Sequence, residues 1–307
     1  MAGKLLLVHG GGPTAVLNCS LYGAAEEAIA SGKIDEVYGA LGGMGGLLAE
    51  RFVRLDTLPS SRRELLRTTP GSAIGTSRDA MEAPEYARAA EVIRKNGFNF
   101  LLCNGGNGTM DTCGKVYEAC QAAGTQVLVA GIPKTMDNDI AVTDHSPGFP
   151  SAARFIAGTV REICADVRSL PLHVCVVEAM GRNAGWVTAA AALASQAGEI
   201  GPDLIYLPER DFDEAAFLQD VERLWARGRG VVVVVSEGIH GPGGKPLVPP
   251  IFQTGRSTYF GDVSAHLAQL VVKELGVKAR SEKPGLAGRC SIHWRSPIDC
   301  REAEEAG

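Results

Sequence analysis

Short apolar runs alternate with helical patterns along the whole chain, and this alternation limits the possible fold more than any other feature. The expected strands cover 4–9, 35–40, 99–104, 126–132, 173–179, 203–208 and 230–238. The expected helices cover 15–30, 84–96, 109–123, 149–168, 185–197, 213–227 and 262–275. Most of the strands are continuously apolar, which is typical of strands covered on both faces. The pattern predicts an α/β protein with doubly wound, mostly parallel sheets.

Charge and cysteine usage exclude several other classes of protein. The 30 Lys and Arg against 35 Asp and Glu give a net charge of −5, which argues against a nucleic-acid binder. No apolar run approaches the roughly 18–20 residues of a membrane span, and the run near the start reads as a buried strand rather than a signal peptide. The 8 cysteines form neither a CxxC pair nor a zinc-spaced cluster, so we expect buried thiols in a cytoplasmic protein.

Glycine-rich or charged loops follow most of the expected strands. These loops are 10–14 (GGGPT), 105–109 (GGNGT), 133–139 (PKTMDND), 180–185 (MGRNAG) and 236–238 (SEG). In open parallel sheets, ligands bind outside the carboxyl ends of the strands, where these loops begin. The loops are therefore the predicted functional region.

The loops GGNGT and GGGPT have the composition of phosphate cradles. Glycines let backbone N–H groups approach an anion, and the following helix presents its positive end. In PKTMDND, an extended backbone would turn Asp137 and Asp139 to one side and Asn138 away. One carboxylate can then accept a hydroxyl proton while the other helps to hold hydrated Mg²⁺. A capped Asx turn at the start of the next helix is the purely structural alternative.

Several further side chains are candidates for binding an anion or a polyol. Gly181 permits close backbone approach, and the forked guanidinium of Arg182 suits phosphate, although a solvated turn is the alternative. Glu237 can accept hydrogen bonds from a polyol or simply cap its loop. Other phosphate candidates, which can equally be solvated surface groups, are Arg78, Arg280 and Arg289. The chain has no GxSxG elbow and no GxxxxGK[ST] loop, which excludes two common catalytic motifs.

Taken together and in order, GGGPTAVLN, GTSR, GGNGT, PKTMDND, DHSPGF, VVEAMGRNAGW and VSEG resemble the 6-phosphofructokinase family. The resemblance is closest to the branch with pyrophosphate-dependent and mixed-donor enzymes. It implies Mg²⁺-dependent phosphoryl transfer to the 1-hydroxyl of fructose 6-phosphate, in a site between two α/β lobes. Residues 1–148, completed by 290–307, would bind the donor, and 149–289 the sugar phosphate. The resemblance also implies a homo-oligomer, either a dimer or a tetramer.

The family resemblance implies a role for each motif residue. Asp137 would be the base, Asp139 would assist it, and Thr135 and Lys134 would serve the transferred phosphoryl group. The implied donor-binding residues are Gly12, Arg78, Gly106, Asn107, Gly108 and Thr109. The implied sugar-phosphate residues are Met180, Gly181, Arg182, Glu237, Arg280 and Arg289. The implied metal ligands are Asn107, Asp137 and Asp139.

The sequence leaves the phosphoryl donor open. Gly108 leaves space where pyrophosphate-specific members carry an Asp, which favours ATP, whereas Lys134 resembles pyrophosphate users. We expect ATP, with a reversible pyrophosphate-dependent enzyme as the alternative. Another Gly-rich-loop kinase acting on NAD or lipid explains only part of the motif set. A non-catalytic, sugar-phosphate-binding regulatory homologue is a further alternative, because Asn107 and Leu286 depart from the family pattern.

Overall fold

The computed structural model describes residues 3–171, 173–198, 200–254 and 257–307. The chain divides into two compact units. Unit 1 comprises Met1–Thr135, Ile140–Pro150 and Arg289–Gly307, and unit 2 comprises Met136–Asp139 and Ser151–Gly288. In the described ranges, no helix is both long enough and apolar enough to cross a bilayer. Which ligand each unit binds stays a prediction.

Unit 1 contains a five-stranded sheet in the order β3-β2-β1-β4-β5. Its strands are β1 (Gly3–His9), β2 (Ile34–Ala40), β3 (Phe52–Arg54), β4 (Phe100–Gly105) and β5 (Leu128–Pro133). Only β3 runs antiparallel to its neighbour. His9 pairs with Asn104, and Gly105 pairs with Pro133. This register brings the loops that follow β1, β4 and β5 to one edge of the sheet.

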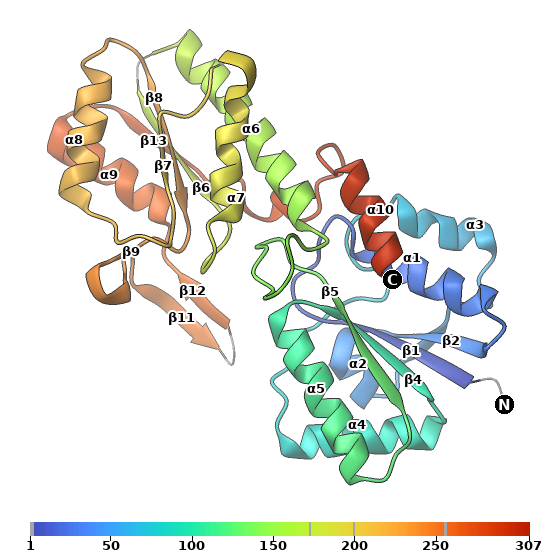
Figure 1. Cartoon of the computed structure of the whole chain (residues 1–307). Coiled ribbons are helices and arrows are strands. Elements are labelled where there is room, and N and C mark those ends of the chain that lie inside the picture. Colours follow the sequence, from blue (N-terminus) through green and yellow to red (C-terminus); the bar gives the residue numbers. More distant parts are fainter. Residues whose placement is uncertain (1–2, 172, 199, 255–256) are drawn as a thin grey trace. The chain divides into compact units, whose positions relative to one another are not determined.

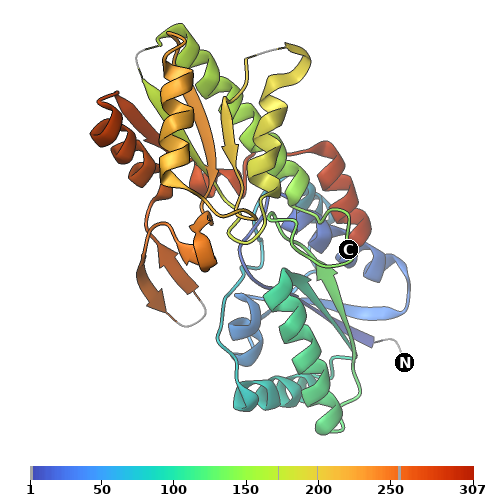
Figure 2. The ribbon, with the colours of Figure 1, turned by 60° about the vertical axis from the view of Figure 1, so that its left-hand side comes forward.

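Helices cover both faces of this sheet (Figure 1). They are α1 (Leu17–Ala30), α2 (Gly43–Leu48), α3 (Ser60–Arg63), α4 (Ala83–Asn96), α5 (Asn107–Ala122) and α10 (Pro297–Ala306), with a 3-10 turn at Glu64–Arg67. Helices α2, α4 and α5 bury apolar side chains against one face, and α1 covers the other. Helix α10 packs on α1 in both views of the ribbon (Figures 1 and 2).

The packing of α10 on α1 depends on a helical glycine. A Cβ at Gly23 in α1 would overlap the carbonyl oxygen of Glu304, whereas a Cβ at Gly114 in α5 would meet nothing within 4 Å. We expect Gly23→Ala to lower the free energy of unfolding by about 1–3 kcal/mol. Gly114→Ala should raise the free energy of unfolding by about 0.5–1 kcal/mol, because alanine loses less backbone entropy than glycine when a helix forms. Urea unfolding of both variants measures this, and equal effects would contradict the close approach.

Unit 2 is built on a four-stranded, fully parallel sheet in the order β13-β6-β8-β7. Its strands are β6 (Val174–Ala179), β7 (Leu204–Tyr206), β8 (Val231–Ser236) and β13 (Ala279–Glu282). Its helices are α6 (Phe149–Ser169, which begins in unit 1), α7 (Trp186–Ala190), α8 (Glu214–Trp225) and α9 (Val263–Leu275). Helices α8 and α9 lie on one side of the sheet (Figure 1). They bury Phe217 and Leu267 in the core cluster that also contains residues of β6 and β8. The expected α/β architecture with mostly parallel sheets is confirmed.

The strands that the sequence did not predict are short or poor in apolar residues. Besides β3 and β13, they are β9 (His240–Gly241), β10 (Lys245–Pro246), β11 (Pro250–Thr254) and β12 (Ser257–Phe260). The Gly- and Pro-rich segment 240–250 contains the β9–β10 pair around a 3-10 turn at Pro242–Gly244. Further 3-10 segments lie at Ala191–Gly198 and Gly285–Gly288. The missed elements carry no apolar periodicity, which is the signal on which strand prediction depends.

Candidate active site

The three loops that follow β1, β4 and β5 are tied together by backbone hydrogen bonds. The N–H of Gly10 donates to the carbonyl oxygen of Asn104 at 2.9 Å. The N–H of Lys134 donates to the carbonyl oxygen of Gly105, also at 2.9 Å. The N–H of Gly11 donates to the Ser77 carbonyl oxygen at 2.9 Å. The segment GTSR is thereby attached to GGGPT, although the two are far apart in the sequence.

Lys134 is the buried cation of this group of loops. Its side chain is 3% exposed, and Nζ donates to the carbonyl oxygens of Gly12 at 2.6 Å and Gly10 at 3.4 Å. These bonds hold the first glycine loop in place. They also put an ammonium charge directly behind the loop, where it would attract a phosphate that binds to the loop.

Two arginines lie beside the same loop. A Cβ at Gly12 would be 3.4 Å from Nη2 of Arg78 and 3.7 Å from Cζ of Arg289. Within the described part of the chain, neither guanidinium makes an ion pair. We call Arg78, Lys134 and Arg289 the Gly12 cation cluster. Arg289 therefore lies in unit 1 beside the expected donor loop, whereas the sequence grouped it with Arg280 in the sugar lobe.

The GGNGT loop opens directly into helix α5. Gly106 precedes the first helical residue, and Asn107 and Gly108 are exposed. No atom lies within 4 Å of the position a Gly108 Cβ would take, while a Cβ at Gly105 would overlap the side chain of Thr109. The glycines thus leave the helix N-terminus open and let the loop pack tightly beneath it, as an anion cradle requires.

Buried polar side chains form the floor below these loops, and the sequence reasoning missed them. His9 ends β1 and is 1% exposed, and its Nδ1 lies 2.8 Å from the hydroxyl of Ser72. His9 Nε2 and both side-chain polar atoms of the neighbouring Asn104 have no hydrogen-bond partner among the described residues. Burial, followed by the charge of Lys134, lowers the pKa of His9 to about 3. The only signal in the sequence that could have indicated His9 and Asn104 is that each is a polar residue at the end of an apolar strand.

The lowered pKa of His9 predicts a dependence of stability on pH. Because the folded pKa of about 3 lies below the unfolded value of 6.5, neutral His9 stabilises the fold above pH 6.5. That contribution is lost progressively as pH falls from 6.5 towards 3, by about 2 kcal/mol at pH 5. Urea unfolding at pH 7.5 and pH 5 should show a larger loss for the wild type than for His9→Gln. If the free energy of unfolding fell equally in both proteins, the lowered pKa of His9 would not be the cause of the pH dependence.

Thr135 is anchored through the last helix of unit 1. Its N–H donates to the carbonyl oxygen of Pro147 at 3.1 Å, and it forms an isolated parallel bridge with Gly148. The N–H of Gly148 in turn donates to Oδ1 of Asp299 at 2.8 Å, and Asp299 is fully buried on α10. Asp299 is therefore a supporting residue of this loop that no motif in the sequence indicated.

The carboxylate segment departs from the extended backbone expected for it. Asn138 has a φ of 55° and is 8% exposed, so the chain turns at this residue and the simple alternation of side chains is wrong. Asn is one of the residues that tolerate this left-handed conformation. Asp137 is half-buried and Asp139 is exposed, and residues Met136–Asp139 group with unit 2.

In unit 2, the loops after β6 and β8 are locked together. Oε1 of Glu237 accepts from the N–H of Gly181 at 3.3 Å, and the hydroxyl of Ser236 donates to the Gly181 carbonyl oxygen at 2.6 Å. Gly181 has a φ of 121°, which a side chain would strain. A Cβ at Gly238 would overlap the backbone of Arg182. The sequence pattern VSEG thus fits against MGRNAGW through backbone contacts that need both glycines.

A cavity of about 320 Å³ in unit 2 brings Arg182 and Glu237 together. Its other lining residues are Asn183, Pro208, Gly238, Ile239, His240, Gly244, Pro246, Leu247, Val248 and Val263. One cation, one carboxylate and an apolar wall suit a small polar ligand that carries an anionic group. Met180, predicted for the same role, is half-buried and precedes this loop without lining the cavity.

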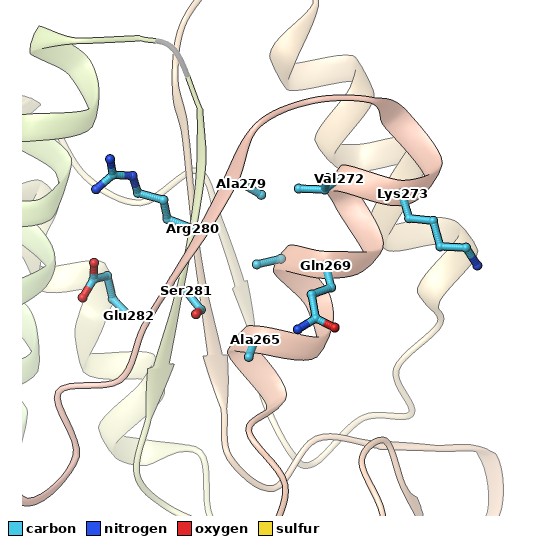
Figure 3. A pocket seen from close by; sticks show the side chains of 9 residues that line it. Ala265, Gln269, Val272, Lys273, Ala279, Arg280, Ser281 and Glu282 are labelled. Carbon is cyan, nitrogen blue, oxygen red and sulfur yellow. The ribbon is translucent and has the colours of Figure 1, made fainter.

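Arg280 lies at a different place in unit 2. It lines a hollow of about 550 Å³ between β13 and α9, together with residues such as Gln269 and Glu282. Figure 3 shows Ala279 and Ser281 directed towards α9, while Arg280 and Glu282 extend from the other side of the strand. The structure therefore does not bring Arg280 into the cavity that holds Arg182 and Glu237.

The expected magnesium ligands are the carboxylates of Asp137 and Asp139 and the amide of Asn107. Among the described residues, no group of three or more His, Cys, Asp and Glu side chains could hold a metal ion. Mg²⁺ in phosphoryl-transfer sites commonly takes one or two carboxylates and completes its shell with phosphate oxygens and water. Asp137 and Asp139, from one short loop, fit that smaller requirement. A protein-only metal cage is not required.

Comparison with known proteins identifies the family. The family described as Phosphofructokinase matches residues 4–293. The chain belongs to the phosphofructokinase family. Its sequence is 37% identical over 315 residues to the pyrophosphate–fructose 6-phosphate 1-phosphotransferase of Rhodospirillum rubrum, covering 99% of this chain and 78% of that protein. As a phosphofructokinase-type protein, it is a phosphotransferase.

Two further relatives match nearly the full length of this phosphofructokinase. The crystal structure of the pyrophosphate-dependent phosphofructokinase from Nitrosospira multiformis superposes with a TM-score of 0.89 at 34% identity, covering 99% of this chain and 74% of that one. A sulfofructose kinase from Alkalicoccus urumqiensis is 32% identical over 306 residues, covering 99% of this chain and 78% of that protein. The two-unit α/β architecture is therefore that of phosphofructokinases.

Proposed function

We propose that this phosphofructokinase transfers a phosphoryl group from pyrophosphate to the 1-hydroxyl of fructose 6-phosphate. The Gly12 cation cluster is the observation that carries the proposal. It gathers three cationic side chains at one glycine loop, and its two arginines make no ion pair in the described residues. Pyrophosphate concentrates its charge on two phosphates and needs no nucleoside pocket, so a compact cationic site suits it.

The expectation of ATP depended on Gly108, and this argument does not discriminate between the donors. The space around Gly108 is open, with no atom within 4 Å of an added Cβ, so it admits either donor. The names of the relatives from Rhodospirillum rubrum and Nitrosospira multiformis both specify pyrophosphate. The names of these relatives therefore favour the pyrophosphate alternative over ATP.

In the proposed reaction, the Asp137 carboxylate takes the proton of the sugar 1-hydroxyl. The hydroxyl oxygen then forms a bond to the terminal phosphorus of pyrophosphate, the bridging P–O bond breaks, and orthophosphate leaves. The Gly12 cation cluster, with Gly106, Asn107, Gly108 and Thr109, would bind the donor. Thr135 would contact the transferred group.

The cavity lined by Arg182 and Glu237 is the proposed sugar site. Met180 and Gly181 directly precede Arg182 in the chain and would position this loop without lining the cavity. Arg280 lies outside this cavity, so we assign it to the 6-phosphate of a sugar bound by a second copy in a dimer or tetramer. Asn107, Asp137 and Asp139 would hold Mg²⁺, which withdraws charge from the phosphoryl oxygens when bound.

Parallel rate measurements with the two donors test the proposal. With fructose 6-phosphate and Mg²⁺, we expect kcat/KM for pyrophosphate to exceed that for ATP by at least about tenfold. Fructose 1,6-bisphosphate and orthophosphate should regenerate pyrophosphate in the reverse direction. Turnover with ATP and none with pyrophosphate would contradict the proposal that pyrophosphate is the donor. If neither donor gives product but fructose 6-phosphate still raises the melting temperature of the protein, the result would favour the non-catalytic regulatory alternative.

A substitution at Gly108 tests whether this position influences the donor. Asp fits the open space there and adds a negative charge at the N-terminus of α5. We expect Gly108→Asp to lower kcat/KM for ATP more than for pyrophosphate, because only ATP has an α-phosphate with an attached nucleoside to accommodate. Equal losses with both donors would show that position 108 does not select the donor, and Gly114→Ala provides the control for a helical glycine.

A further inference from the structure

Two pairs of cysteines belong to the same packed clusters in unit 1. One pair is Cys19 with Cys300, and the other is Cys103 with Cys113. Cys19 lies on α1 and Cys300 on α10, so their contact results from the packing of the last helix on the first. All the cysteines are free thiols in the structure.

The two pairs differ in their access to solvent. Cys103 and Cys113 are both buried in the core between the sheet and its covering helices. Cys19 and Cys300 instead line a surface hollow of about 1000 Å³, bounded by α1, α10 and Arg67. Cys19 is 1% exposed, whereas Cys300 is half-buried. A small solute can therefore reach Cys300 from the hollow, which Cys19 also lines.

The surroundings of Cys300 favour its thiolate. The adjacent Cys19 side chain and the charge of Arg295 lower the pKa of Cys300 to about 7, although burial and Asp299 oppose the shift. The same contact and burial raise the pKa of Cys19, which keeps Cys19 protonated. The thiolate is the nucleophilic form of cysteine, so Cys300 is the attacking group and Cys19 the resolving group.

We propose that Cys19 and Cys300 form a modification site that a hydroperoxide oxidises to a disulfide, which joins helix α1 to helix α10. The Cys300 thiolate attacks a peroxide oxygen, the O–O bond breaks, and hydroxide or alkoxide leaves, giving a sulfenic acid. The Cys19 thiol then attacks that sulfur, the S–O bond breaks, and water leaves. The two thiols lose two electrons in total, and the peroxide gains them.

The disulfide would act on a helix that supports the candidate active site. Cys300 follows Asp299, whose carboxylate holds Gly148, the bridge partner of Thr135. Joining α10 to α1 therefore fixes the support of that loop. The inference depends on the thiol pair and its hollow, and it does not depend on the proposed function.

Oxidation of the full-length protein tests the site directly. Reduced protein is treated with hydrogen peroxide, blocked with an alkylating agent and digested with trypsin. We expect peptide 5–33 to be linked to peptide 296–301, with the loss of two hydrogens, and the link to disappear after reduction. The melting temperature of oxidised protein should rise by several degrees and return to its initial value with a reductant, because the cross-link closes a long loop.

The two thiol pairs provide matched variants. Cys300→Ser and, independently, Cys19→Ala should abolish both the linked peptide and the rise in melting temperature, whereas Cys113→Ser should retain both. Three results would overturn the proposal. They are free thiols at Cys19 and Cys300 after peroxide, sulfinic acid on Cys300 without a link, and loss of the link in Cys113→Ser.

Discussion

The Asp137→Asn variant should lose about 10²- to 10⁴-fold in kcat, the range typical of a missing general base. Asn keeps the shape of the side chain but cannot accept the proton of the sugar hydroxyl. Because Asp137 is half-buried and its loop turns at Asn138, this isosteric change should leave the fold intact. Initial rates with pyrophosphate and fructose 6-phosphate, together with the melting temperature, measure the two effects separately.

A surface carboxylate provides the control for this variant. Asp35 is exposed on β2, and Asp35→Asn should leave kcat within about twofold of the wild type. Wild-type turnover in a folded Asp137→Asn protein would remove Asp137 from the role of base.

The Lys134→Met variant should show the second large effect, on donor binding and on stability together. Met fills the same space, but it leaves the carbonyl oxygens of Gly10 and Gly12 without the Nζ donor. An unsatisfied buried group costs about 1–3 kcal/mol, and the loop also loses its buried positive charge. We expect the KM for pyrophosphate to rise by at least about tenfold. The pKa of His9 should also rise, because the charge of Lys134 lowers it.

Lys115 is a matched control, because it is an exposed lysine on α5 with Asp111 as its ion-pair partner at 2.7 Å. Lys115→Met should change neither the KM for pyrophosphate nor the titration of His9, which NMR can follow. If Lys134→Met binds pyrophosphate like the wild type, the Gly12 cation cluster does not hold the donor. The pKa of His9 would still show whether the buried charge had been removed.

The main sheets were predictable because their strands are continuous apolar runs. The predicted segments 99–104 and 230–238 became β4 and β8, with every boundary shifted by one or two residues. Strand β13 was not predictable, since ARSE contains no apolar run and owes its conformation to pairing with β6. Such pairing is non-local and leaves little trace in the local sequence.

The candidate site was predictable only where a local motif specifies it. The glycine loops, Lys134 and the pair Arg182 and Glu237 came from residues adjacent to strand ends, so their approximate positions followed from the order of strands. The supporting residues His9, Asn104 and Asp299 were missed. Their partners lie far away in the chain, and a buried histidine or aspartate looks the same in sequence as an exposed one.

The sequence by itself determined the alternation of strands and helices and the loops at which glycines and charges gather, because those depend on residue type and spacing. The tertiary structure alone decided which distant groups meet at these loops. It places Arg289 beside Gly12, turns the backbone at Asn138, and sets Cys300 against Cys19. These contacts depend on helix packing and backbone torsion, which are settled only when the whole chain has folded.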